Sequence, residues 1–529
     1  MSLHHVLALH QHPHGDEPAQ RKPVRPGVVL ATGTVAAAMA GLDGTVLNVA
    51  IPTIASDLDA DLAEVEWVVS AYSLAFAALL ILFGTLGDAF GHRRMLIGGL
   101  VLFVTSSAFA ALAPNAQLLI TARALAGIGA AAMSPAYVAL IVAAYAPERR
   151  ANAIGVMFGG ASVGLALGPL IGGLLVETVG WPWVFWLSVP LGLGALALTL
   201  TSIPETEPHR PDRLDFPGVA LSIGALLGFT YGLIESTVSG FTSPEVLIAL
   251  VAGLVLGAAF IVRERRAATP EIDLRLFGET GFRSPLVIAA VVAFGMLSVF
   301  LFVSIYYQQL RGLSAIETGL LYLPSTLAIV VLAPLSGRAA DRFGARAAVS
   351  VALLFAAAGL GLFAFVDPDT SLLLLGLAQL LIGIGAGLAL PSLSALTIAA
   401  VESARSGLAS SVMRTSREMA GTFGVAVIGA LVVAFAGLSF RGDLERSDLP
   451  APAVAALDDA KVVGGAPLPR SGLSEPQYDS AREFARDAAA TGIGRALACG
   501  AVLVLLAALY AVRTLPRRRP AEAAAREAH

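Results

Sequence analysis

Long apolar runs separated by short polar links recur along the whole chain. Each run has about 20 or more mostly apolar residues, the length that an α-helix needs to cross a bilayer, and the alternating pattern of a membrane barrel strand is absent. Irregular backbone cannot face lipid, so every run is interpreted as a helix. We predict an all-α membrane protein with fourteen transmembrane helices, at residues 28–54, 66–86, 95–113, 117–144, 151–176, 181–203, 215–236, 244–263, 284–309, 317–338, 347–366, 371–400, 408–438 and 491–513.

The charges in the links predict the topology. An even number of spans puts both chain ends on one side of the membrane. The links on that side are rich in arginine, for example Arg93, Arg94 and Arg346, whereas the short links on the other side carry acids such as Asp57 and Asp367. Because arginine-rich links stay in the cytoplasm, we expect both termini to be cytoplasmic and the protein to lie in the plasma membrane.

The amino-acid composition is typical of a membrane protein. Of 529 residues, 56% are hydrophobic and 14% are charged, and the mean hydropathy is +0.78, so a water-soluble fold of this size would lack the polar surface to cover itself. The net charge of -4 says little about partners. Cys499 is the only cysteine, so no disulfide can form within the chain.

Few features point to catalysis or to a bound metal. The N-terminal tail holds five of the eight histidines, but no cysteine or acidic cluster completes a metal site there, so a solvated tail is favoured. A phosphate-binding Gly-x-x-x-x-Gly-Lys loop is absent. We therefore expect no enzyme activity, no cofactor, no metal and no nucleic-acid partner.

One polar link occurs twice. Its first copy reads Gly-Thr-Leu-Gly-Asp-Ala-Phe-Gly-His, and its second, 253 positions later, reads Gly-Arg-Ala-Ala-Asp-Arg-Phe-Gly-Ala. The residues that recur are Gly84, Asp88, Gly91 and Arg93 in the first copy and Gly337, Asp341, Gly344 and Arg346 in the second. A further match, Gly-Ile-Gly-Ala at 127–130 and 383–386, has an offset of 256. Two repeats at nearly one offset indicate duplicated halves.

The offset also predicts the domain organisation. Two halves of six helices each would lie nearer 200 residues apart, so two extra helices are expected between them. We assign a cytoplasmic tail at 1–27, a six-helix bundle at 28–203, two extra central helices at 215–263, a second bundle at 284–513 and a cytoplasmic tail at 514–529. The segment 439–490, rich in Pro, Gly, Ala and charges, is expected to be an external loop with little structure of its own.

At this point the sequence resembles the major facilitator superfamily, and within it the fourteen-helix drug:proton antiporter branch. The family pattern for the link after the second helix, Gly-x-Leu-Ala-Asp-Arg-x-Gly-Arg-Lys, is matched at Asp88, Gly91 and Arg93, while Ala89 and His92 stand where arginines are expected. The resemblance implies two pseudo-symmetric bundles that export drugs in exchange for protons. We expect Asp88 and its repeat Asp341 to hold a cytoplasmic gate closed.

The fifth helix carries the pattern that separates exporters from importers in this family. Its positions are Gly155, Gly164, Gly168, Pro169, Gly172 and Gly173. Glycines spaced by four residues line one stripe of a helix, which lets a neighbouring backbone approach closely, and the proline bends the helix. Such stripes also serve ordinary helix packing, but the complete pattern favours the antiporter interpretation.

Two buried charges are predicted to couple transport to protons. Asp43 lies inside the first span, where an ionisable group costs roughly 2.5–3.5 kcal/mol and is functional by default; the alternative is a structural hydrogen bond near Asn48. Arg123 lies inside the fourth span, and its repeat partner at the 256 offset is Gln379. A charge used in one half only is expected of a coupling residue. The family has an arginine at this position too, and Arg123 is expected to pair with Asp43.

Other polar groups in the spans are weaker candidates. Asn48, Tyr72, Tyr137 and Gln308 are expected to line the cavity, although Tyr137 and Gln308 also suit the headgroup region. The long side chains of Arg414 and Arg417, at the start of the thirteenth span, are expected to reach water.

Two classes of function remain from the sequence. The first is a proton-coupled exporter of amphipathic or cationic compounds, whose partners are the substrate, protons and the bilayer, and which is expected to be a monomer. The second is a metabolite symporter of the same fold or a membrane sensor without transport activity. A sensor would need a soluble effector domain, and the two tails are too short to form one.

Overall fold

The computed structural model describes residues 25–204, 216–267, 274–401, 406–447 and 473–517, together with isolated positions between 449 and 468. Within these residues the regular structure is helical, and fourteen helices are long and apolar enough to cross a membrane. They match the fourteen predicted spans in order. The histidine-rich tail lies outside the described residues.

The first half of the chain forms one bundle of six spans. Its helices are α1 (Pro26–Asp57), α2 (Leu62–Phe90), α3 (His92–Ala111), α4 (Ala116–Ala144), α5 (Pro147–Thr178), α6 (Pro182–Trp186) and α7 (Ser188–Ser202). The sixth predicted span is divided between α6 and α7 at Leu187. We call this unit the N-terminal bundle.

The second half forms the C-terminal bundle. Its helices are α10 (Thr280–Ile305), α11 (Ala315–Phe343), α12 (Ala345–Leu362), α13 (Leu372–Ala399), α14 (Ser406–Arg446) and α16 (Glu475–Thr514), with a 3-10 turn η1 (Leu274–Gly278) before α10, a π-helical turn η2 (Tyr306–Leu310) after it and a 3-10 turn η3 (Phe363–Phe365) after α12.

Two further helices lie between the bundles in the sequence, as the repeat offset predicts. They are α8 (Phe216–Ser239) and α9 (Pro244–Arg266). The two pack on each other, and α8 also contacts α2 and α14. The side of α9 that faces away from the protein is apolar, with Leu247, Ile248 and Val251 at least half exposed, as a lipid-facing surface requires.

The duplication is visible in how corresponding helices begin and end. A capping box of Asp61 and Glu64 starts α2, and one of Ser314 and Glu317 starts α11. Each helix ends at a glycine with positive φ, Gly91 at 99° and Gly344 at 82°, a conformation that a β-carbon disfavours. The glycines predicted from the repeated link are therefore required by the backbone of the turn.

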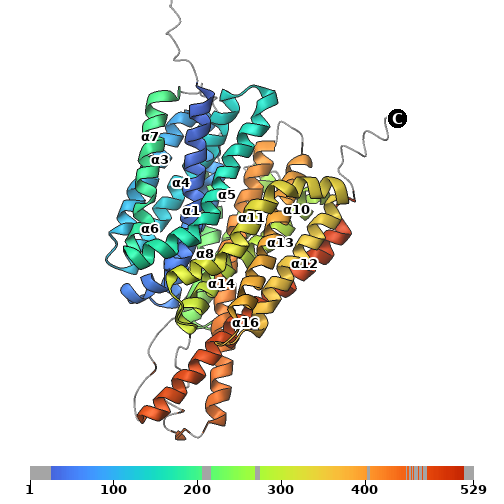
Figure 1. The fold of residues 1–529 in the computed structure, drawn as a ribbon. Helices are drawn as coiled ribbons and strands as arrows, with labels where there is room; N and C mark the ends of the chain where they lie inside the picture. The colour runs from blue at the N-terminus through green and yellow to red at the C-terminus, as the bar shows by residue number, and fades with distance from the viewer. Residues whose placement is uncertain are drawn as a thin grey trace, which may run out of the picture.

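Figure 1 shows that α1 begins and α16 ends at the same end of the molecule, which we call the terminal end. At the opposite end, α14 and α16 project together beyond the other helices, and we call this the hairpin end. Contacts between the two bundles run mainly through α5 with α11, α2 with α14 and α1 with α10. We call this interface the seam.

The seam is closely packed near the hairpin end. A β-carbon at Gly319 of α11 would lie 2.5 Å from the Pro169 carbonyl oxygen of α5, and one at Gly173 would collide with the Ala315 carbonyl. In the same region Gln308 donates a hydrogen bond of 2.8 Å to the Val49 carbonyl of α1. The two bundles thus meet backbone to backbone at this end.

The expectation that residues 439–490 have little structure is wrong at both ends of that segment. Helix α14 continues to Arg446, and α16 already begins at Glu475. Their projecting ends pack on each other through an apolar cluster that includes Phe440, Leu444 and Tyr478. These apolar positions recur at helical spacing, and their burial stabilises the helices outside the apolar runs. Much of 447–474 lies outside the described residues.

Candidate functional site

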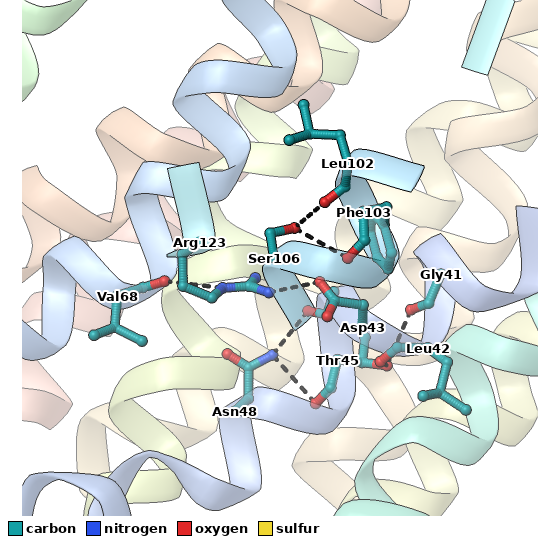
Figure 2. A network of polar contacts seen from close by, with 11 residues as sticks. Gly41, Leu42, Asp43, Thr45, Asn48, Val68, Leu102, Phe103, Ser106 and Arg123 are labelled. Atoms are coloured by element: carbon teal, nitrogen blue, oxygen red, sulfur yellow. Dashed lines mark hydrogen bonds and ion pairs between the residues drawn. The ribbon is translucent and has the colours of Figure 1, made fainter. Parts of the chain in front are cut away.

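An ion pair is buried in the centre of the N-terminal bundle. Arg123 of α4 donates from Nη1 to Oδ2 of Asp43 on α1 at 2.7 Å, and both side chains are at most 3% exposed. Figure 2 shows the two side chains pointing toward each other between their helices. The two charges singled out from the sequence therefore face each other, 80 residues apart in the chain.

Arg123 is held from several sides. Its Nε donates to the Val68 carbonyl of α2 at 3.3 Å, and its guanidinium carbon lies 4.6 Å from the centre of the Tyr72 ring and 5.9 Å from that of Phe185. A cation over an aromatic face is stabilised by the ring quadrupole, more strongly where water is excluded. Arg123 thus keeps favourable contacts that do not depend on the charge of Asp43.

The polar groups next to Asp43 on α1 bond elsewhere. Asn48 donates to the carbonyls of Gly44 and Thr45 at 3.2 and 3.4 Å, and its own Oδ1 has no partner in the described part of the chain. Asp43 therefore pairs with Arg123, and the hydrogen bonds of Asn48 go to backbone carbonyls and not to Asp43. Thr45 donates to the Leu165 carbonyl of α5 at 3.0 Å and so ties the two helices together beside the pair.

The glycines of the fifth span bring α5 against α1. A β-carbon at Gly164 would collide with the Ala38 carbonyl, one at Gly168 with the Thr45 hydroxyl, and one at Gly172 would lie 2.6 Å from the Val46 carbonyl. Gly155 has open space around it. The stripe predicted from the four-residue spacing is therefore a backbone contact with the helix that carries Asp43, whereas Gly155 lies outside that contact.

A second polar cluster joins the two bundles nearer the terminal end. Arg414 of α14 donates to the Ser134 hydroxyl of α4 at 2.9 Å and lies 4.8 Å from the centre of the Phe76 ring on α2. Tyr137, which is 2% exposed, shares a hydrogen bond of 3.2 Å with Ser134. The side chain of Arg414, expected to reach water, is partly exposed, and it also crosses the seam and finds partners in the other bundle.

The four predicted cavity residues lie at different places. Asn48 lies one turn after Asp43 on α1, as described above. Tyr72 and Tyr137 are buried in the N-terminal bundle, close to the two arginines named above. Gln308 lies in the π-helical turn η2 and bonds across the seam to Val49. Such π-helical turns are frequent at functional sites. The four predicted cavity residues thus lie around the central pair or on the seam.

The repeated links contact the last helix of their own bundle. Arg93 donates to the Leu200 carbonyl at 3.0 Å, near the end of α7. Its repeat, Arg346, donates from Nε to the Leu515 carbonyl at 2.7 Å, at the end of α16. A cation at the C-terminus of a helix is favoured by the helix dipole and by the carbonyls left without partners there.

The acid of the first link has a local partner. Asp88 accepts a hydrogen bond from His92 at 3.1 Å, one helical turn on, and its side chain is 63% exposed. His92 stands where the family pattern has an arginine. Gly84 and Asp88 lie in the last turns of α2, and Gly337 and Asp341 lie at the corresponding place in α11.

Known proteins with similar sequences identify the family of this chain. The family model described as Major Facilitator Superfamily matches residues 33–425. The chain belongs to the major facilitator superfamily. It is thus a multi-pass membrane protein of a transporter family, with the all-helical architecture expected from its sequence.

Individual relatives of this superfamily agree along most of the chain. The Tetracenomycin C resistance and export protein of Streptomyces glaucescens is 31% identical over 511 residues, 96% of this chain and 95% of that protein. The Multidrug resistance protein Stp of Mycobacterium tuberculosis (strain CDC 1551 / Oshkosh) is 35% identical over 422 residues, 79% of this chain and 78% of Stp. A solved structure of a bacterial homolog to the human lysosomal transporter Spinster, inward-facing and unoccupied, shares the fold with a TM-score of 0.61 at 19% identity, covering 94% of this chain and 99% of that one.

Sequence reasoning misses one contact and one acid at the seam. It does not predict the contact of Arg414 with Ser134, and it does not single out Glu66 on α2, although the Glu66 side chain is fully buried. Glu66 follows Asp61 and Glu64, which cap α2, so the local sequence resembles an exposed helix start. Only its position at the first residue of the second predicted span, residue 66, could have drawn attention to it.

Proposed function

We propose that this protein exports amphipathic or cationic drugs across the plasma membrane in exchange for protons, by alternating access. The names of its relatives support drug export, since they describe a tetracenomycin C export protein and a multidrug resistance protein. The arginine-rich links support a cytoplasmic terminal end and hence an external hairpin end. In this proposal the chain acts as a monomer, because each chain has both bundles.

The observation that carries the proton coupling is the buried pair of Asp43 and Arg123. An ionised Asp43 is stabilised by Arg123 at 2.7 Å in a site from which water is excluded. When Asp43 takes up a proton, the ion pair is lost, but Arg123 keeps the Val68 carbonyl and the Tyr72 ring. Arg123 stays charged throughout, since a guanidinium does not lose its proton in proteins. The pair can therefore change its protonation state without leaving a bare buried charge.

The packing of α1 on α5 supports a link between this proton and movement. The glycine stripe places the α5 backbone against the segment of α1 that includes Asp43 and Thr45. A rearrangement around Asp43 therefore acts on α5, and α5 in turn packs on α11 across the seam. In transporters of this kind, one bundle rocks against the other around a central site. Protonation of Asp43 would bias that equilibrium.

The test compares substrate-driven proton movement in everted vesicles of the parent and of Asp43→Asn. With an acidic lumen, adding a transported drug should release protons from the lumen in the parent, as followed with a pH-sensitive dye. We expect no release in Asp43→Asn at equal amounts of inserted protein. A drug-susceptibility panel in a host without its own pumps identifies a suitable compound.

Matched variants keep the test interpretable. Asp59→Asn changes an exposed aspartate just after α1 with φ of 49°, which asparagine tolerates, and should release protons like the parent. Asp43→Asn/Arg123→Gln removes both charges of the pair and should likewise show no release. Proton release in Asp43→Asn at the parent rate would exclude Asp43 as the coupling acid. Drug movement out of the lumen, in the same direction as the protons, would favour a symporter instead.

A further inference from the structure

A carboxylate without a partner is buried in the seam near the hairpin end. Glu66 lies in the second turn of α2, and its side chain is 0% exposed. Neither of its carboxyl oxygens has a hydrogen-bond partner in the described residues. Buried carboxyl groups are normally hydrogen-bonded or paired with a cation, so this one requires an explanation.

The surroundings of Glu66 come from both bundles. Its carboxyl group lies against Gly429 of α14, where a β-carbon would collide with Oε1 and would lie 3.1 Å from the Phe302 ring of α10. Beside it, Ala63 of α2 packs in one cluster with Ile234 of α8 and Ala426 of α14. The absence of a side chain at position 429 is what makes room for the acid. Opening the seam at this end would move α14 and α10 away from Glu66 and admit water.

Among the described residues, these neighbours bring no positive charge to Glu66. The contacts from α14 and α10 are a glycine and an aromatic ring, and α8 contributes apolar residues. Glu235, next to Ile234 on α8, accepts a hydrogen bond from Ser239 instead. Asp61, the N-cap of the same helix, adds a negative charge near the start of α2, and a negative charge repels a carboxylate. A buried carboxyl group without a cation or a hydrogen-bond donor is favoured in its neutral form, so we assign a proton to Glu66 in the closed seam.

We propose that Glu66 is a second proton-binding residue, which takes up a proton from the hairpin side before the seam closes and returns it to that side when the seam opens. The proposal rests on the alternating access of the proposed function. It differs from the role of Asp43, because Glu66 meets water on one side only. Its proton is not carried across the membrane. Glu66 instead sets the pH at which the hairpin end of the seam can close.

The sign of the effect follows from which state binds the proton. The closed seam requires protonated Glu66, whereas the open seam accepts either form. Raising the pH therefore favours the open seam, by up to about tenfold for each pH unit once Glu66 titrates in the open state. A neutral isostere at this position should remove the effect and leave the seam closed.

The experiment measures access to a cysteine placed in the seam. In a Cys499→Ser background, Ala426→Cys is labelled with an impermeant maleimide in lipid nanodiscs, where pH is equal on both sides. We expect labelling to be slow at pH 6 and several-fold faster at pH 8. In Glu66→Gln it should be slow at both pH values. Because thiols react faster at high pH, rates are divided by those of Phe241→Cys, at a position 50% exposed.

Three further variants separate the effect of charge at Glu66 from that of shape. Glu235→Gln removes an acid on the neighbouring helix and should keep the pH dependence. Gly429→Ala places a methyl group where the Glu66 carboxyl lies, so it should speed labelling at both pH values. Adding Glu66→Ala to Gly429→Ala removes the collision and should make labelling slow again.

Two results would overturn the proposal. One is a parent labelling rate that does not change with pH after normalisation, and the other is a pH dependence that survives in Glu66→Gln. Neither depends on substrate or on a proton gradient. Failure of proton exchange at Asp43 would therefore refute the proposed function while leaving the labelling result to decide the role of Glu66.

Discussion

Arg123 and Gln379 occupy the same place in the two bundles. Each lies seven residues after the first residue of its helix, α4 or α13, and each is at most 2% exposed. Arg123 is paired with Asp43, whereas the Gln379 amide nitrogen has no hydrogen-bond partner in the described residues. The duplication thus preserved a buried polar position in both bundles but kept a charge at this position only in the first.

The contrast predicts the effect of Arg123→Gln. A glutamine fits the equivalent position of the other bundle, so the variant should insert normally. Without the guanidinium, an ionised Asp43 has lost its charged partner, so substrate-driven proton release should fall several-fold. Vesicle assays at equal amounts of inserted protein measure this.

Arg123→Lys is the matched control for charge. A lysine keeps the positive charge but cannot bond to Asp43 and to the Val68 carbonyl with one planar group. We expect intermediate proton release. If Arg123→Gln released protons at the parent rate, Arg123 would not act on the proton of Asp43.

The contact of Gly168 with Thr45 predicts a specific loss of coupling. In Gly168→Ala, the added methyl group would collide with the Thr45 hydroxyl and lie 3.0 Å from the Val46 nitrogen. Separating the helices here displaces the segment of α1 that includes Asp43. We expect coupled proton flux per inserted molecule to fall several-fold, and more than the amount of inserted protein.

Two variants test whether that loss comes from the contact itself. Gly159→Ala lies on the same helix where a β-carbon meets open space, and it should behave like the parent. Adding Thr45→Ala to Gly168→Ala removes the colliding hydroxyl and should restore part of the flux. Loss of folded protein in Gly168→Ala, with full activity per remaining molecule, would instead mean that the stripe serves packing alone.

The fold could be predicted from the sequence because lipid leaves the backbone few choices. Run length identified the spans, and the repeat offset identified the two extra helices, α8 and α9. The projecting ends of α14 and α16 were not predicted, because their stability does not come from burial in lipid. Phe440 and Tyr478 are apolar residues in a polar stretch, and only their mutual packing makes that stretch helical.

The candidate site was predictable in part for a similar reason. Asp43 and Arg123 stand out because a charge within an apolar run has few alternatives to a buried partner. Arg414 and Glu66 lie near the ends of their runs, where a charge ordinarily reaches water. The burial of Glu66 and the contacts of Arg414 depend on how α14 packs on α2 and α4, and a single sequence does not contain that relationship.

The arginines of the repeated links predict a ranking of stability. Arg346 donates to Leu515 in a partly buried setting, and Arg93 donates to Leu200 in an exposed one. Arg346→Gln should therefore lower the free energy of unfolding by about 1.5–3 kcal/mol, and Arg93→Gln by about 1 kcal/mol or less. Thermal unfolding in detergent measures both, with the exposed Arg338→Gln as control.

Transport per folded molecule separates this anchoring role from a gate. Both arginines act within their own bundle, so transport corrected for folded protein should change little. Asp88→Asn and Asp341→Asn complete the comparison, because a gate between bundles would make cysteines near the terminal end more accessible in these variants. A large loss of corrected transport in Arg93→Gln would show that the link does more than fasten its helices.

The contact between Ser134 and Arg414 predicts that two distant substitutions are coupled. Ser134→Ala removes the hydroxyl that accepts from Arg414 across the seam at 2.9 Å, and Arg414→Gln removes the donor together with the cation over Phe76. Hydrogen bonds to charged groups contribute about 1.5–3 kcal/mol, so Ser134→Ala should destabilise the parent but have little further effect in Arg414→Gln. Ser70→Ala on α2, whose hydroxyl has no partner in the described residues, should show equal effects in both backgrounds.

Because this contact must break when the bundles part at the terminal end, Ser134→Ala should also speed labelling of a cysteine placed at that end of the seam. Additive stabilities and unchanged labelling would mean that Arg414 does not hold the bundles together.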